Sequence, residues 1–362
     1  MILSVCSKGE RKIYMDFVKS IYSKFPEYKD CSSPILKSFL YKKGAFCMNS
    51  EITPILVKEG SSVLAACIYI ISKNYPDVLQ IAFFEALADC QDAVDLIMKR
   101  AKELCAEKNL HAITVGLNGH VNYGLGFLYD KFQDGLSFGS NFNPPYYPEY
   151  FSKYSPKRFN LVSFKGDMEN VNFEREKDIL NRITKKFNYR EANFSKFKSE
   201  MKVYTDLNNQ CFMEHPFYFL REYQEDYELF SELKYFIKGE NLLFAEHNNT
   251  TIGFLLWYPD FNELLDRGKT IGVDTFIKNK LFSKRIDKFK IVEIAVIPQY
   301  QKSGVILGLF NELYNKTKGR FSSYETSWIL EDNYRSKSLG AKWAEEEYKH
   351  FVAFEISPKE II

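Results

Sequence analysis

The most informative stretch of the chain is VEIAVIPQYQKSGVILGLF, residues 292–310. Its apolar residues predict a buried strand that ends at Pro298, followed by a short polar loop and a helix that begins at about Gly304. The first N–H groups of a helix lack partners within it and carry partial positive charge, which suits a phosphate or pyrophosphate. Gly304 lets the backbone approach such a group closely, and Lys302 adds a positive charge. The stretch therefore predicts an anion-binding helix start, with an ordinary strand–turn–helix packing unit as the alternative.

Outward from this stretch, the spacing of apolar residues predicts the same order of elements in both halves of the chain: helix, hairpin, strand, helix, strand. In the first half we expect these elements at residues 11–27, 54–70, 79–85, 92–108 and 111–115, then a loop over 116–150 and a strand over 158–166. In the second half we expect them at 195–209, 242–257, 291–296, 304–318 and 325–330, with a last strand over 350–355. The repeat predicts two α+β domains, over residues 1–170 and 189–362, joined by a helical connector over 171–188.

The composition narrows the class of protein. With 49 Lys and Arg against 47 Asp and Glu, the 362 residues carry a net charge of +2, which gives no overall field for holding DNA or an anionic membrane. The 7 cysteines are scattered singly and form no CxxC or Cys/His cluster, which predicts reduced thiols, no zinc site and a cytoplasmic protein. We expect no signal peptide, since Lys8 comes too early for an apolar core, and no membrane span, since the longest apolar run is residues 63–71.

The 292–310 stretch resembles the acyl-CoA-binding segment of the GNAT superfamily of N-acetyltransferases. In that segment a strand ends in Val-x-Pro. The motif Gln/Arg-x-x-Gly-x-Gly/Ala then follows, where x is any residue. Gln301 and Gly304 match the pattern, whereas Ile306 stands where the last small residue is expected. The position of the motif, after a strand and before a helix, adds to its specificity.

Further motifs, in order along the chain, resemble a family of bacterial tandem-GNAT proteins. In the first half these are Gly116-Leu117-Asn118 and NPPYYP at 143–148; in the second half they are Gly253-Phe254, PDFN at 259–262, ETSWILEDN at 325–333 and Gly340-Ala341. The resemblance implies an α+β (α/β-like) fold with two GNAT-like domains, each a mixed, mostly antiparallel sheet flanked by helices. It also implies transfer of an acyl group to an amine, with acetyl-CoA or another acyl-CoA as co-substrate.

The resemblance assigns the acyl-CoA contacts to the strand end and the helix start. Backbone groups of Ile294, Ala295 and Val296 would bond the pantetheine arm. The pyrophosphate would be surrounded by the residues of the loop and first helical turn, which are Gln301, Lys302, Ser303, Gly304, Val305 and Ile306. Asn333 matches an Asn that lies close to the co-substrate in many relatives.

Glu293 is our candidate for the base that takes a proton from the attacking amine. It is the one charged residue in an apolar strand, and simple alternation places it on one face with Ile291 and Ala295. A desolvated carboxylate has a raised pKa, which suits a base near neutral pH. The alternative is a solvated Glu or one paired with a Lys. Tyr324 and Ser327, on or beside the neighbouring strand, are the next catalytic candidates.

Substrate contacts are expected from two other segments. The loop over 116–150 is long and supplies Asn118, Asn143 and Tyr146, although it can also be a packing loop. The aromatic cluster over 212–219 supplies His215 and Phe217, which would wall an amine pocket or belong to the core.

The first domain is expected to have lost acyl-CoA binding. Its junction at residues 83–92 has no glycine and no basic residue, and Asp89 and Asp92 would repel a pyrophosphate. The sequence as a whole predicts an acyl-CoA-dependent N-acyltransferase that acts on an amine of a small molecule or peptide, as a monomer or homodimer, without a metal, DNA or a membrane. The alternatives are a non-catalytic protein that binds acyl-CoA or a small ligand, and a transferase that takes its acyl group from aminoacyl-tRNA.

Overall fold

The computed structural model describes residues 1–282 and 285–361. The strands of the N-terminal half are β1 (Ile2–Val5), β2 (Ser50–Glu59), β3 (Ser62–Ser72), β4 (Tyr75–Ala86), β5 (Ala112–Val115), β6 (Phe127–Leu128) and β7 (Lys157–Asp167). Its helices are α1 (Arg11–Tyr22), α2 (Ser33–Leu40), α3 (Ala45–Met48), α4 (Gln91–Lys108) and α5 (Tyr147–Ser152).

The C-terminal half follows the same plan. Its strands are β8 (Asn188–Glu191), β9 (Leu242–His247), β10 (Thr250–Pro259), β11 (Lys288–Val296), β12 (Ser323–Thr326), β13 (Ile329–Leu330) and β14 (Glu346–Ile356). Its helices are α6 (Lys177–Lys186), α7 (Phe197–Cys211), α8 (Tyr223–Leu233), α9 (Val273–Phe282), α10 (Val305–Thr317) and α11 (Tyr334–Gly340).

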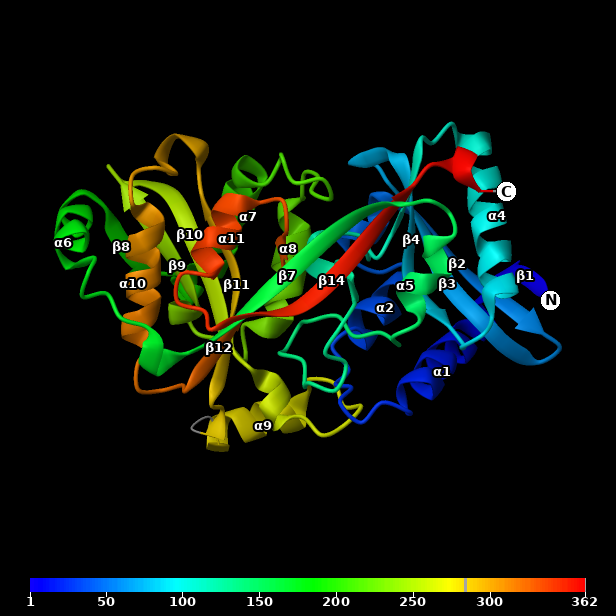
Figure 1. The fold of residues 1–362 in the computed structure, drawn as a ribbon, viewed down its shortest axis with the longest axis horizontal. Coiled ribbons are helices and arrows are strands. Elements are labelled where there is room, and N and C mark those ends of the chain that lie inside the picture. Colours follow the sequence, from blue (N-terminus) through cyan, green and yellow to red (C-terminus); the bar gives the residue numbers. More distant parts are fainter. Residues whose placement is uncertain (283–284, 362) are drawn as a thin grey trace.

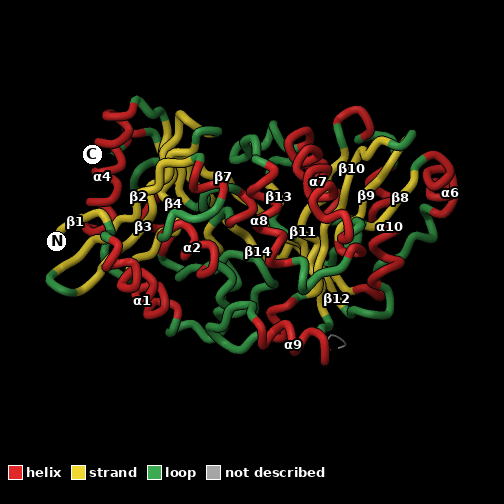
Figure 2. The backbone as a smooth tube through the Cα atoms, turned by 180° about the vertical axis from the view of Figure 1, so that it is seen from behind, coloured by secondary structure: helices red, strands yellow, loops and turns green. Residues whose placement is uncertain are grey.

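One continuous, mostly antiparallel sheet runs through both halves, in the order β1-β2-β3-β4-β5-β14-β7-β12-β11-β10-β9-β8. Its centre is the long antiparallel pair of β7 and β14, which crosses from one half to the other (Figure 1). Strand β14 also pairs with β5, and β7 also pairs with β12. Each half therefore contributes a strand that lies against the other half. Both chain ends lie beside α4 as a result (Figures 1 and 2).

The fold class expected from the sequence is confirmed. The long predicted helices are observed as α4 and α10, close to their predicted bounds. The predicted loop over 116–150 contains β6 and the start of α5, and the predicted division at residues 170 and 189 remains a prediction. Strand β1, which pairs with β2, was not expected, because four residues carry too little pattern to predict a strand.

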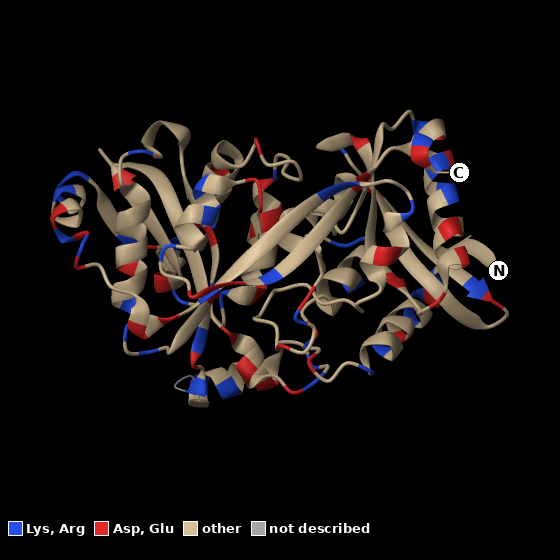
Figure 3. Ribbon diagram, viewed as in Figure 1, with Lys and Arg blue, Asp and Glu red and all other residues tan. Residues whose placement is uncertain are grey.

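Charge is spread evenly over the molecule. Figure 3 shows Lys and Arg interspersed with Asp and Glu along the helices at both ends, in keeping with a net charge of +2. Within the described residues, no helix combines the length and the apolar character that crossing a bilayer requires.

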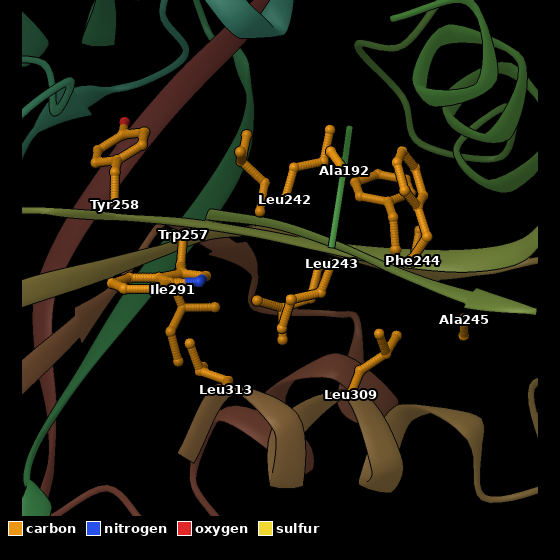
Figure 4. Close-up of a cluster of buried hydrophobic side chains, with 14 of the residues drawn as sticks. Ala192, Leu242, Leu243, Phe244, Ala245, Trp257, Tyr258, Ile291, Leu309 and Leu313 are labelled. Atoms are coloured by element: carbon orange, nitrogen blue, oxygen red, sulfur yellow. The ribbon is translucent and has the colours of Figure 1, made fainter. Parts of the chain in front are cut away.

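A close-packed core fixes α10 against the sheet of the C-terminal half. Val305, Leu309 and Leu313 recur at every fourth position and are buried, as expected for one face of a helix. Figure 4 shows Leu313 directed at Ile291 of β11 and Trp257 of β10, and Leu309 directed at the sheet near Leu243 of β9. Burial of these large side chains holds the start of α10 next to the end of β11.

Candidate functional site

The two parallel strands β11 and β12 part in the middle of the C-terminal half. Their pairing runs from Lys288 opposite Ser323 to Ile291 opposite Thr326, where β12 ends. Strand β11 continues to Val296 and remains paired with β10 on its other side. The backbone of residues 292–296 therefore borders an opening in the sheet.

A register shift in β11 changes the face of Glu293. Leu256 of β10 lies opposite Glu293, whereas the next residue, Trp257, lies opposite Ile291, so Val292 is an extra residue in the strand. Because neighbouring residues of β10 point to opposite faces, Ile291 and Glu293 do too. The expectation that Glu293 shares a face with Ile291 was wrong, although Glu293 does share one with Ala295. Ile291 packs towards α10, and Glu293 points towards α7.

The carboxylate of Glu293 is held by α7. The hydroxyl of Tyr204 donates a hydrogen bond to Oε2 of Glu293. Burial raises the pKa of Glu293, while the charge of Arg221 and the Tyr204 hydrogen bond act to lower it. The net direction is upward, as a base for an ammonium group requires.

A buried ion pair lies behind this carboxylate. Nη1 of Arg221 lies 3.1 Å from Oδ1 of Asp226, and both side chains are almost fully buried. The hydroxyl of Thr205 donates to Asp226 at 2.7 Å. The Arg221 guanidinium also lies 5.4 Å from the centre of the Tyr204 ring. Since Asp226 offsets the positive charge of Arg221, the pair stabilises the Glu293 anion less than a free guanidinium would.

A cavity of about 1820 Å³ surrounds the opening and is lined by both halves of the chain. From the C-terminal half it reaches β11, α7, α8 and the first turns of α10 and α11. From the N-terminal half it reaches the end of β4 and the segments around residues 118 and 142. Glu293 and Tyr204 lie on its wall, so the carboxylate is accessible from the cavity.

The start of α10 has the donors that an anion needs. Gly304 precedes the helix with φ of +85°, a left-handed conformation that favours glycine. Among the backbone hydrogen bonds of the described residues, none is donated by the N–H groups of Val305, Ile306 or Leu307. The side chains of Ile306 and Leu307 lie on the cavity wall. The free N–H groups and the exposed Lys302 therefore fit a phosphate group at this end of the cavity.

Solved structures share this architecture. The chain is similar to a tandem GNAT protein from the clavulanic acid biosynthesis pathway, with a TM-score of 0.55, 11% identity, and coverage of 99% of this chain and 98% of that chain. The tandem GNAT fold is that of this chain. This chain is also similar to a GCN5-related N-acetyltransferase from Sphaerobacter thermophilus, with a TM-score of 0.52 and 8% identity. The match covers 99% of this chain and 95% of that chain. A GCN5-related glucosamine N-acetyltransferase region of a fungal multi-domain β-N-acetylglucosaminidase has a TM-score of 0.60 at 12% identity, over 98% of this chain and 38% of that chain.

Comparison at the level of sequence finds no relatives of this chain. No family model matches the chain, and no curated protein matches it. The likeness therefore rests on the arrangement of elements, which confirms the resemblance to GNAT proteins expected from the sequence.

Within the tandem GNAT fold, the expected acyl-CoA contacts lie in two positions. Those on the cavity wall are Ile294, Ala295, Val296, Gln301, Ile306 and Asn333. The others lie in the adjoining loop and first turn, with Lys302 exposed, Ser303 and Gly304 half-buried and Val305 in the core. The side chain of Asn333 caps α11 by accepting a hydrogen bond from the N–H of Ser336.

The structure places the other two catalytic candidates in different parts of the C-terminal half. Ser327 lies on the cavity wall, and its N–H donates to the carbonyl of Ile291 at 2.8 Å. Tyr324 is buried beside Phe289 and Trp343 around a separate small cavity of about 40 Å³, so the structure does not bring it to Glu293.

Only some of the expected substrate contacts lie on the cavity wall. Asn118, Asn143 and His215 lie on the cavity wall, whereas Tyr146 and the buried Phe217 lie outside it. Asn143 is occupied locally, since its amide bonds both backbone groups of Leu128. Burial lowers the pKa of His215 to about 4, and its Nε2 has no hydrogen-bond partner in the described residues. A neutral imidazole is therefore available to the cavity.

Sequence reasoning missed Tyr204, Arg221 and Asp226. Tyr204 lies on the predicted helix over 195–209, one turn after the apolar residue Met201, and a polar group on that buried face was the available signal. Arg221 and Asp226 approach it from the α7–α8 connection and from α8, and no sequence spacing predicts that contact. Within the described residues, no group of three or more His, Cys, Asp or Glu could hold a metal ion.

Proposed function

We propose that the chain is an acyl-CoA-dependent N-acyltransferase, with acetyl-CoA as the preferred donor and an amine of a small molecule or peptide as the acceptor. One observation carries the proposal: a carboxylate with a raised pKa, Glu293, shares a cavity with the free N–H groups at the start of α10. The tandem GNAT architecture supports the proposal, and so does the position of Glu293 and of the start of α10 beside the point where β11 and β12 part.

The reaction needs one proton acceptor and one polarised thioester. Glu293 takes a proton from the ammonium group of the acceptor, while Tyr204 holds the carboxylate in place. The free amine attacks the thioester carbonyl, a C–N bond forms, and the C–S bond breaks to release CoA as a thiolate that takes up a proton. Backbone N–H groups of residues 294–296, at the opening in the sheet, are our candidates for binding the pantetheine arm.

Calorimetric titration with acetyl-CoA tests the donor site. We expect Lys302→Glu to weaken binding about tenfold, since it replaces an attractive charge by a repulsive one next to the phosphate site. Lys198→Glu, the same charge change at an exposed position of α7, is the matched control and is expected to bind like the wild type. A saturating ligand at about 100 times its Kd stabilises the fold by roughly 2.7 kcal/mol, so thermal unfolding is a second readout. Absence of binding by acetyl-CoA, longer acyl-CoAs and CoA would overturn the proposal.

A non-catalytic protein that binds acyl-CoA or a small ligand is the second candidate. Ile306 favours it, because a branched side chain lines the cavity at the first turn of α10, where the resemblance has a small residue. The two functions differ in one measurement. If wild-type protein binds acetyl-CoA but releases no CoA with any amine, the chain is a binding protein; if it turns over and Glu293→Gln does not, it is an enzyme.

A further inference from the structure

We infer that the acceptor is a primary amine with an apolar, aromatic or long alkyl body and with no carboxylate or phosphate group. This inference rests on the proposed function and names the substrate class of the same cavity. It follows from three properties of the cavity wall: its aromatic lining, the position of its charges and its size.

Aromatic and aliphatic side chains from both halves form the wall. Tyr28, Phe138 and Phe142 come from the N-terminal half, and Phe236 and Phe276 come from the C-terminal half. Phe142 packs at 6.0 Å from Tyr28, between ring centres, so this part of the wall is a continuous aromatic surface. Such a surface stabilises an apolar ligand body in proportion to the area that it removes from water.

The charges on the wall are arranged for a cation. Besides Glu293, the acidic side chains on the wall are the exposed Glu214, Glu232 and Asp332 and the buried Glu85. Burial raises the pKa of Glu85 to about 8, so the negative charge of the wall comes from the other four. The described cationic side chains on the wall are Lys29, whose Nζ donates to the carbonyl of Leu265, and Arg335 and Lys342, which are exposed.

The same arrangement disfavours an anion. The buried guanidinium of Arg221 lies outside the wall and is paired with Asp226. A carboxylate on the acceptor, next to an amine that reaches Glu293, would be desolvated without a cationic partner and close to a like charge. Such a carboxylate is disfavoured, whereas an ammonium group is favoured.

The size of the cavity leaves room for an extended acceptor. Ligand pockets for small molecules commonly measure about 300–1,000 Å³, and this cavity measures about 1820 Å³. The thioester end of an acyl-CoA at residues 294–307 accounts for one side of it. The part lined by Tyr28, Phe138 and Phe142 lies beyond, and an apolar body attached to the amine would fill it.

Matched acceptor pairs test the inference. With acetyl-CoA, initial rates of CoA release are compared for phenethylamine and phenylalanine, which differ only in the carboxylate, and for butylamine, hexylamine and octylamine. We expect kcat/KM to be at least 100-fold higher for phenethylamine than for phenylalanine. We expect it to rise three- to fourfold per added methylene along the alkyl series, as burial of each CH₂ predicts. Equal rates for the pair, or no dependence on chain length, would overturn the inference.

A cation placed on the wall should relax this selection. Leu229 of α8 is half-buried and lines the cavity. We expect Leu229→Lys to narrow the phenethylamine-to-phenylalanine ratio at least tenfold, because it supplies a partner for the carboxylate. Leu229→Met, which keeps the volume without the charge, is expected to leave the ratio unchanged, and thermal unfolding of both variants checks that they fold.

Failure of the substrate class is distinguishable from failure of the proposed function. If no amine releases CoA, the proposed transfer reaction fails, and the inference is judged by calorimetric titration of the wild type with the same pair. Binding of phenethylamine with at least 100-fold preference over phenylalanine then supports the inferred ligand class. Equal or reversed affinity overturns it.

Discussion

Glu293 is a residue on which opposing effects act. Burial disfavours its charged form, while the hydroxyl of Tyr204 and the guanidinium of Arg221 favour it. The net direction is upward, so the carboxylate binds a proton more firmly than an exposed glutamate does, as suits a base. In the proposed reaction, Tyr204 would tune the basicity of Glu293 rather than take part in the bond changes.

Removal of the Tyr204 hydroxyl should shift the pH dependence of turnover. In Tyr204→Phe we expect the acidic limb of kcat/KM to move up by about one pH unit, because one hydrogen bond that favours the anion is lost. The rate at high pH should stay close to the wild-type rate, whereas Glu293→Gln should lower kcat by a factor of about 100 or more at all pH values.

Tyr223→Phe is the control for this shift. Its hydroxyl is buried without a hydrogen-bond partner in the described residues, so its loss should leave the profile unchanged. An acidic limb that stays in place in Tyr204→Phe would show that Glu293 is not the titrating group.

Glu85 makes the stability of the chain depend on pH. Its carboxylate accepts hydrogen bonds from Tyr22 at 2.9 Å and Tyr147 at 2.7 Å, and burial raises its pKa to about 8. Between the ordinary pKa of a glutamate and 8, the folded chain holds a proton that the unfolded chain releases. The free energy of unfolding therefore falls as pH rises through this window, by up to about 1.4 kcal/mol per pH unit from this group.

Urea unfolding at pH 5.5 and 7.5 measures this effect. Glu85→Gln should remove about 2 to 3 kcal/mol of the difference between the two pH values. Glu225 and Asp260, whose pKa values burial raises to about 7 and about 6, add to the slope in both proteins. The exposed Glu59→Gln variant should keep the wild-type slope. The same slope in Glu85→Gln as in the wild type would contradict the assignment.

At the scale of one element, the start of α10 depends on a residue that only glycine fits. A Cβ on Gly304 would lie 2.6 Å from Cδ1 of Ile183 on α6, and its φ is +85°. We expect Gly304→Ala to lower the free energy of unfolding by about 2 to 3 kcal/mol, from left-handed strain and this overlap together.

Two further variants separate strain from overlap. Gly319 has a φ of +71° with open space around it, so Gly319→Ala should cost only about 1 kcal/mol. Ile183→Val removes the overlapping atom and should make Gly304→Ala less costly in the double variant. Additive losses in urea unfolding would show that the overlap contributes nothing.

Elements with a strong local pattern were predictable from the sequence, and through-space features were not. The spacing of apolar residues predicted the position of α10, and the run of apolar residues predicted that of β11. The extra residue at Val292 was missed because it is defined by pairing with β10, not by β11 itself. Glu293 could be singled out as a charge in an apolar strand, whereas its partner Arg221 is 72 positions away and no pattern links the two.

At the scale of the whole molecule, the two halves treat the same strand opening differently. In the N-terminal half the parallel pair of β4 and β5 ends at Ile81 opposite Val115, and β4 continues to Ala86, as β11 continues past Ile291. In this half, tyrosine side chains form hydrogen bonds with the backbone groups at the end of β4. Tyr147 donates to Glu85 and accepts from the N–H of Ala86, and Tyr146 donates to the Ala86 carbonyl at 3.1 Å.

A third tyrosine side chain bonds the backbone just before α4. Tyr150 bonds both the carbonyl of Leu87 and the N–H of Cys90, the residue before the helix. Tyr146 and the tyrosines of α5 thus occupy the backbone of residues 86–90, next to the start of α4. Asp89 and Asp92 add negative charge at the position where a phosphate would lie.

This asymmetry predicts one acyl-CoA per chain. Calorimetric titration with acetyl-CoA should give a stoichiometry of one, and Lys302→Glu should weaken the whole signal rather than half of it. The reason is that tyrosine side chains occupy the backbone of residues 86–90, and Asp89 and Asp92 repel a phosphate at the start of α4. Lys99→Glu, a charge change on the N-terminal half's α4, should leave affinity and stoichiometry as in the wild type. A stoichiometry of two, or a second component that Lys302→Glu does not affect, would mean that α5 moves aside. In that case the N-terminal half would be a second acyl-CoA site, and the cavity would hold two thioesters instead of one thioester and its amine.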